Sequence, residues 1–232
     1  MARTVHKRSE TTGMAPGTMI YIGEPKTARV RVRVFDYDKD KYEEKEGLSV
    51  GECLALRDKP TVTWINVDGI HDVDLVARLG DGFNLHPLTM EDIVRAHQRP
   101  KAEDYDHYLY LVLRMPYFTP AGQLEAEQIS IILTETCVLS FQEHEGDVFD
   151  PIRDRIRYDK GRVRKMTADY LAYCLVDAIV DNCFAILENI GDRVEELEDR
   201  LVRNPDPTAL MQVYQLKRQL ILLRRAVWPL RE

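Results

Sequence analysis

Residues 86–115 read HPLTMEDIVRAHQRPKAEDYDHYLYLVLRM, and this stretch decides much of the fold of the 232-residue chain. Proline is well placed in the first turn of a helix, so Pro87 predicts a short helix over residues 87–97. The Arg-Pro-Lys run at 99–101 predicts an elbow that fixes where the next strand begins. The stretch therefore predicts a helix, a bend and a strand, with Glu91 and Asp92 adjacent on the helix.

The first 165 residues alternate between strand-like and helix-like patterns. Valines at 30, 32 and 34 alternate with arginines, which is typical of a half-buried strand, whereas the charged segment 38–49 predicts a surface helix or turn. A sheet covered by helices is the layered arrangement that suits such a pattern. We predict a short strand after a turn at Pro16-Gly17, strands over 28–37, 61–67, 108–115, 123–133 and 137–142 (the last two as a hairpin), and helices over 71–85 and 147–158.

The pattern changes after Lys165, where apolar residues begin to recur at steps of three and four. Residues 167–202 predict one long helix with a coiled-coil-like seam, interrupted by the polar Asn182. Asn-Pro-Asp-Pro at 204–207 breaks this helix, and a second periodic run over Leu210–Leu230 follows. Because the connection is short, the two helices are expected to pack antiparallel. The predicted organisation is a disordered tail over 1–13, a layered domain over 14–165 and a helical hairpin over 166–232.

Composition narrows the classes of function. The net charge of −7 argues against a general nucleic-acid binder, which would carry a basic surface. Acidity suits cation binding, although moderate acidity also keeps many proteins soluble. The four cysteines form no C-x-x-C motif, and such scattered thiols fit a reducing cytosol. No stretch approaches the roughly 18 consecutive apolar residues that predict a membrane helix.

Two pairs of acidic residues are candidates for cation ligands. Glu91 and Asp92 lie near the start of a predicted helix, where negative charge also opposes the helix dipole favourably. Asp177 and Asp181 are four residues apart, so they share one face of the long helix, where acids are usually only solvated. Histidines at 71, 86 and 97 invite a transition-metal interpretation, but their spacing favours capping or turn roles.

Six segments of this chain, in this order and at this spacing, resemble the CorA family of magnesium and cobalt channels. The resemblance covers residues from about 16 to 232. The segments are PTVTWINVDGIH, HPLTMEDIVRAHQRPK, EAEQISIILTETCVLSFQE, GDVFDPIRDRIRYDKGRVRK, DYLAYCLVDAIVDN and QLKRQLILLRRAVWPLRE. The family implies an α+β fold, an α/β/α sandwich with a mixed sheet, followed by a long antiparallel helical hairpin that begins the stalk.

The resemblance also implies a function. CorA proteins resemble a funnel of five identical subunits in the inner membrane, and Mg²⁺ (with Co²⁺ possible) binds between neighbouring subunits on the cytoplasmic side to gate the pore. Family carboxylates match Glu91, Asp92 and Asp177, and Asp181 is added by its proximity. The chain contains no Gly-Met-Asn pore motif. It is therefore expected to be the non-enzymatic cytoplasmic part, stopping before the membrane helices, with no nucleic-acid partner.

Three other interpretations stay open at this stage. A zinc-transporting relative of the ZntB kind would share the architecture. A metal-dependent hydrolase is suggested by the carboxylates and histidines between residues 86 and 107, although we expect no nucleophile elbow, no phosphate-binding glycine loop and no H-E-x-x-H motif. A coiled-coil adaptor is suggested by residues 167–232 alone, and it would associate independently of ions.

Overall fold

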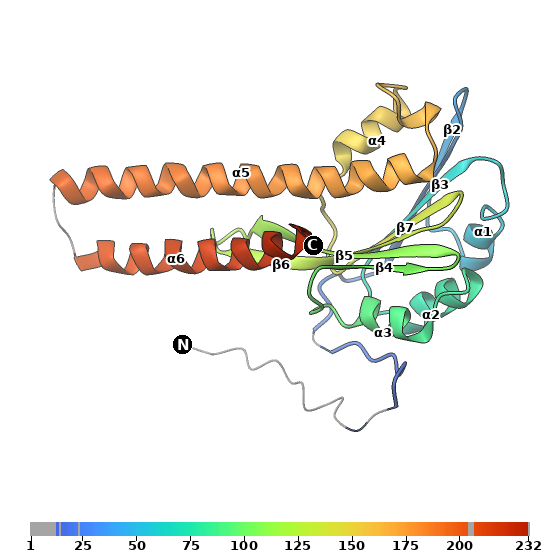
Figure 1. Cartoon of the computed structure of the whole chain (residues 1–232), viewed down its shortest axis with the longest axis horizontal. Coiled ribbons are helices and arrows are strands. Elements are labelled where there is room, and N and C mark those ends of the chain that lie inside the picture. Colours follow the sequence, from blue (N-terminus) through green and yellow to red (C-terminus); the bar gives the residue numbers. More distant parts are fainter. Residues whose placement is uncertain (1–12, 14, 23, 204–206, 232) are drawn as a thin grey trace.

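The computed structural model describes residues 13, 15–22, 24–203 and 207–231. The predicted tail over 1–13 lies outside the described residues except for Gly13. A layered α/β body occupies one end of the molecule, and two long helices extend from it side by side (Figure 1). This arrangement confirms the predicted α/β/α sandwich followed by a helical hairpin.

A single seven-stranded mixed sheet forms the centre of the body, in the order β2-β1-β3-β7-β6-β5-β4. The central neighbours β3 and β7 run parallel, and every other pair of neighbours is antiparallel. The strands are β1 (Arg31–Tyr37), β2 (Tyr42–Glu46), β3 (Val62–Asp68), β4 (Lys101–Tyr105), β5 (Tyr108–Phe118), β6 (Leu124–Leu133) and β7 (Cys137–Gln142). The predicted hairpin of β6 and β7 is confirmed.

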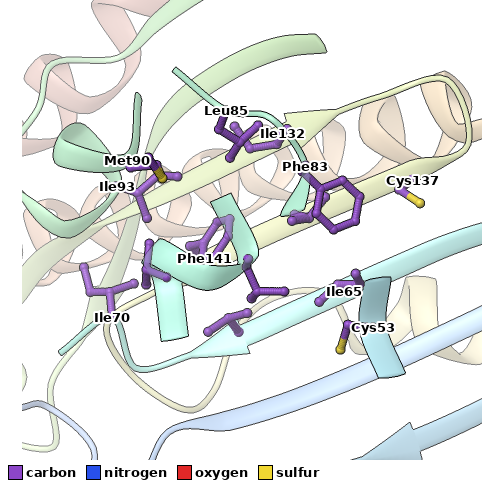
Figure 2. Close-up of a cluster of buried hydrophobic side chains, with 14 of the residues drawn as sticks. Cys53, Ile65, Ile70, Phe83, Leu85, Met90, Ile93, Ile132, Cys137 and Phe141 are labelled. Atoms are coloured by element: carbon purple, nitrogen blue, oxygen red, sulfur yellow. The ribbon is translucent and has the colours of Figure 1, made fainter. Parts of the chain in front are cut away.

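Helices cover both faces of the sheet because successive side chains of each strand point to opposite sides. On β3, Ile65 and Val67 join the first core beneath α1 (Val50–Leu54), α2 (Val73–Gly82) and α3 (Pro87–Val94). Figure 2 shows part of this core, with Met90 and Ile93 of α3 and Phe141 of β7. Trp64 points the other way, into a second core beneath α4 (Asp150–Arg157) and the first half of α5 (Ala168–Arg203).

Several predicted elements need correction. Segment 38–49 contains β2, an exposed edge strand, rather than a helix or turn. The turn at Pro16-Gly17 is present, but no strand follows it among the described residues 18–22. The strand β4 was missed, and a turn at 106–107 separates it from β5. The helices α2 and α3 are both shorter than predicted. The first spans Val73–Gly82 rather than 71–85, and the second ends at Val94 rather than at 97.

The helical hairpin consists of α5 and α6 (Pro207–Val227), which run antiparallel as predicted. The seam of α5 is confirmed, and Asn182 has a structural role because its Nδ2 donates to the Pro116 carbonyl oxygen at 2.6 Å. The apolar seam predicted for α6 is only partly right. Leu223 is buried against α5, but Leu210 and Leu220 are exposed, and Ala209 and Ala226 are buried instead.

One described helix, α5, is long and apolar enough to cross a membrane on length and composition alone. The expectation that no stretch of the chain is long and apolar enough to cross a membrane is therefore wrong by this test. Core helices of soluble proteins pass the same test. Leu171, Leu175 and Ile179 of α5 are buried in the second core, which accounts for much of the apolar character of this helix.

A chain of buried hydrogen bonds crosses the parallel pair of β3 and β7. Trp64 Nε1 donates to Ser140 Oγ at 2.9 Å, Ser140 Oγ donates to Asn66 Oδ1 at 2.7 Å, and Asn66 Nδ2 donates to Asp68 Oδ1 at 2.8 Å. Burial raises the pKa of the Asp68 carboxyl to about 6, with a smaller contribution from the charge of Asp147. Ionisation of this carboxyl therefore lowers the free energy of unfolding as the pH rises.

The pH dependence has a definite sign. Below about pH 4 Asp68 is protonated in both folded and unfolded chains, and above pH 6 the folded protein must hold a buried negative charge. We expect Asp68→Asn to raise the free energy of unfolding by roughly 1–3 kcal/mol at pH 7.5 and to leave it nearly unchanged at pH 4. Urea denaturation at the two pH values measures this difference, and an equal change at both would contradict the assignment.

Two helical glycines provide a matched test of packing. A Cβ atom added at Gly80 of α2 would lie 2.2 Å from Met90 Sδ of α3, whereas one added at Gly191 of α5 would meet nothing within 4 Å. We expect Gly80→Ala to lower the free energy of unfolding by roughly 1–2 kcal/mol through overpacking, and Gly191→Ala to raise it by about 0.5–1 kcal/mol. Thermal unfolding of the two variants checks both signs, and a stabilised Gly80→Ala variant would refute the tight approach of α2 to α3.

Candidate functional site

The short helix α3 holds the first pair of candidate ligands in a fixed position. His86 is its N-cap, and the Nδ1 atom of this side chain accepts a hydrogen bond from the Leu88 amide at 3.2 Å. This confirms the capping role expected for His86. Met90, Ile93 and Val94 are buried in the first core, so the helix cannot rotate without exposing them.

Asp92 is held by polar side chains that follow it closely in the sequence. Its Oδ1 accepts from Gln98 Nε2 at 2.8 Å, and its Oδ2 accepts from Lys101 Nζ at 2.7 Å. Gln128 of β6 donates to the backbone carbonyl of Asp92 at 2.8 Å. Two side chains thus hold the carboxylate and a third holds its backbone, and the carboxylate already has one positive charge beside it.

Glu91 has a different environment from its neighbour. The residue is only 7% exposed. Its Oε2 accepts from the Gly17 amide at 2.6 Å, and its Oε1 forms an ion pair with Arg95 one turn later in the chain. These contacts fasten the N-terminal segment onto α3, and they leave the two oxygens of Glu91 engaged within the chain.

The second pair of candidates lies on α5. Asp177 is half-buried, and its Oδ1 accepts from the Tyr173 hydroxyl at 3.4 Å. The negative charge of Asp177 raises the pKa of that tyrosine. Asp181 lies one turn further along α5 and is exposed. Asp181 is therefore more accessible than either carboxylate on α3, whereas Asp177 is partly buried like Asp92.

The two pairs do not meet within one chain. The helix α3 packs on one face of the sheet and α5 on the other, as their separate cores require (Figure 1). Across the described part of the chain, no group of three or more His, Cys, Asp or Glu residues is arranged to hold a metal ion. A site that used Asp92 and Asp177 together would need a second copy of the chain.

The donor atoms present suit a hard cation. Magnesium prefers oxygen ligands and keeps several of its waters, so one or two carboxylates on separate surfaces are chemically adequate. Asp92 already holds an ammonium group, which demonstrates that its position favours positive charge. Glu91 fits less well, because an ion would have to replace both the Gly17 amide and the Arg95 guanidinium.

Sequence reasoning did not identify the residues around Asp92. The stretch 86–115 contains Gln98, Lys101 and Glu103, but only the turn after α3 brings these residues back to the Asp92 carboxylate. Their sequence signal is the polar and basic run immediately after the helix. The spacing of nine residues between Asp92 and Lys101 matches no helical or strand repeat, so the contact depends on tertiary structure.

Comparisons with known proteins agree with this architecture. The chain is 45% identical, over 225 residues, to the cobalt/magnesium transport protein CorA of Thermotoga maritima; the match covers 97% of this chain and 64% of that protein. Among solved structures, full-length CmaX matches with a TM-score of 0.72 at 17% identity, covering 90% of this chain and 62% of that one. The ZntB cytoplasmic domain of Vibrio parahaemolyticus matches with a TM-score of 0.62 at 15% identity, covering 85% and 75%.

These structural likenesses support the fold alone, since their sequence identities are low. The sequence match is more specific. Residues 60–232 match the family model described as "CorA-like Mg2+ transporter protein", which is well over half of the chain. The chain belongs to the CorA-like Mg²⁺ transporter family.

Proposed function

We propose that this chain is the cytoplasmic regulatory part of a divalent-cation (Mg²⁺/Co²⁺) channel that senses Mg²⁺ at contacts between subunits. The main support is the placement of Asp92 and Asp177 on opposite faces of one sheet. Asp92 of one copy can therefore face Asp177 of a neighbouring copy. The CorA relative of Thermotoga maritima, named as a cobalt/magnesium transport protein, supports the ion class.

The remainder of the protein is part of the same proposal. The chain spans 64% of the length of its CorA relative. We infer that the remaining third of such a protein carries the membrane helices in the inner membrane, with this portion on the cytoplasmic side. We also infer a homopentamer, in which the α3 surface of one subunit faces the α5 surface of the next.

Electrostatics explains how an ion at such a contact can act as a switch. Two unit charges of the same sign 4 Å apart repel by about 4 kcal/mol at an effective dielectric constant of 20. A divalent cation between two acidic surfaces removes this repulsion and adds attraction, so subunits stay together when it is bound. The ion favours the closed channel only if it binds that arrangement more tightly than the open one.

The four candidate residues contribute unequally to this proposal. Asp92 and Asp177 carry it, because both are partly exposed and, within the described part of the chain, Asp177 accepts a single long hydrogen bond, from Tyr173. Asp181 supplies further negative charge on the exposed face of α5. Glu91 serves mainly to anchor the N-terminal segment, so its effect on ion binding is expected to be indirect.

A zinc-transporting relative is the second candidate, and the ZntB cytoplasmic domain shares the fold. Zinc favours imidazole and thiolate ligands over carboxylates. In this chain His86 serves as a helix cap, and the four cysteines are buried. The oxygen-rich surfaces therefore favour Mg²⁺.

A metal-dependent hydrolase is disfavoured, because the CorA relative is named as a transport protein. The expectation that the chain has no nucleophile elbow needs correction, since Ser49 lies in Gly-Leu-Ser-Val-Gly at 47–51, which has that spacing. In the structure Ser49 is the N-cap of α1 and forms a capping box with Glu52. Its Oγ donates to Glu52 Oε2 at 2.6 Å, so the hydroxyl has a structural role.

Charge removal in the full-length protein tests the proposed site. We expect Asp92→Asn and Asp177→Asn each to weaken the protection against proteolysis that Mg²⁺ provides, because each removes an oxygen anion from the subunit contact. Asp192→Asn, also on an exposed part of α5, is the control and is expected to retain full protection. Unchanged protection in both test variants would refute the assignment.

Ion preference gives an independent check. Calorimetric titration of the full-length protein is expected to give Mg²⁺ binding that is lost in Asp92→Asn. If zinc were the regulatory ion, Zn²⁺ would bind much more tightly than Mg²⁺, and the Asp92→Asn change would leave that binding in place.

A further inference from the structure

The ammonium group of Lys101 occupies a defined position between two carboxylates. Its Nζ lies 2.7 Å from Asp92 Oδ2 and 2.7 Å from Glu103 Oε1. The same atom lies 5.3 Å from the centre of the Tyr110 ring, within the range of a cation–π contact. With Gln98 on the other oxygen, both carboxylate oxygens of Asp92 are engaged in this state.

This pair is less solvated than an ordinary surface ion pair. The side chain of Lys101 is 29% exposed and that of Asp92 is 22% exposed. Screening by water is correspondingly weak, and the attraction between Lys101 and Asp92 is significant.

We propose that Lys101 is a tethered competitor for Asp92, whose ammonium group must leave the carboxylate before a divalent cation can bind there. The inference rests on the function proposed above and deepens it, because it identifies what sets the ion concentration at which the site fills. A hydrated divalent ion bound at Asp92 would lie close to the Lys101 ammonium group, and their like charges repel at this distance.

The chain also provides a place for the displaced ammonium group. Glu103 lies on the edge strand β4, its side chain is 39% exposed, and its second oxygen accepts from the Tyr105 hydroxyl at 3.3 Å. Lysine has a flexible stem and a compact charge, so a rotation about side-chain bonds moves Nζ away from Asp92 while it stays beside Glu103. Displacement therefore does not leave a positive charge without a partner.

The competition is tested by Mg²⁺ titration of the full-length protein, with protection against proteolysis as the readout. We expect Lys101→Met to lower the Mg²⁺ concentration for half-maximal protection by about two- to fivefold, the range for a partly exposed charge pair. Lys101→Arg keeps the charge and is expected not to lower this concentration. Lys59→Met is the matched control, because Lys59 is paired with Asp36 at a distance of 3.4 Å elsewhere in the fold.

Chemical labelling distinguishes displacement from a general effect of charge. Mass spectrometry of acetylated full-length protein is expected to show Mg²⁺ increasing the labelling rate of Lys101 relative to that of Lys59. An unchanged relative rate, or an equal shift of the titration by Lys59→Met, would overturn the inference. If Asp92→Asn abolishes protection while Lys101→Met leaves the midpoint unchanged, the inference fails and the proposed function stands. If Asp92→Asn has no effect, the proposed function itself fails.

Discussion

The separation of the two apolar faces of the sheet is the constraint on which the rest of the structure depends. Strands β3 and β7 lie at its centre, and each contributes alternate side chains to two independent cores. Burial of such side chains is the main source of stability. A helix whose apolar side is buried on one face of the sheet therefore stays on that face. The same constraint places Asp92 and Asp177 on opposite sides of the molecule, so an ion site that used both would require an assembly of chains.

The polar contacts around α3 show how a short helix is kept in one orientation. Its buried face is fixed by packing against α2, and its outer face is fixed by side chains from the turn and from β6. Glu91 and Asp92 are neighbours in sequence, yet one is buried beneath the N-terminal segment and the other lies beside a lysine. Adjacent acids in one motif can therefore have separate roles, because helix geometry turns them toward different surroundings.

Much of the architecture could be predicted from the sequence, and the exceptions have physical reasons. The long helix α5 was predicted well because its apolar repeat is sustained and Pro205 and Pro207 follow it. The strand β2 was missed because all five of its residues are exposed and none marks an apolar face. The inward face of α6 was misjudged because apolar residues lie on more than one side of that helix. Family resemblance proposed Glu91, Asp92 and Asp177 as candidate ligands, whereas the contact of Lys101 with Asp92 forms only when the chain folds.

The second core and the hairpin share a single rigid element. The helix α5 is 36 residues long, which corresponds to about 54 Å at 1.5 Å per residue. Its first half is held by the sheet, and its middle contacts the β5–β6 hairpin through Cys183, Ile186 and Leu124. The half of α5 beyond the sheet, about 27 Å long, can therefore act as a lever arm: a rotation of about 5° at the sheet would carry its far tip through roughly 2 Å. A small repositioning of the body is in this way amplified at the distal end of the molecule.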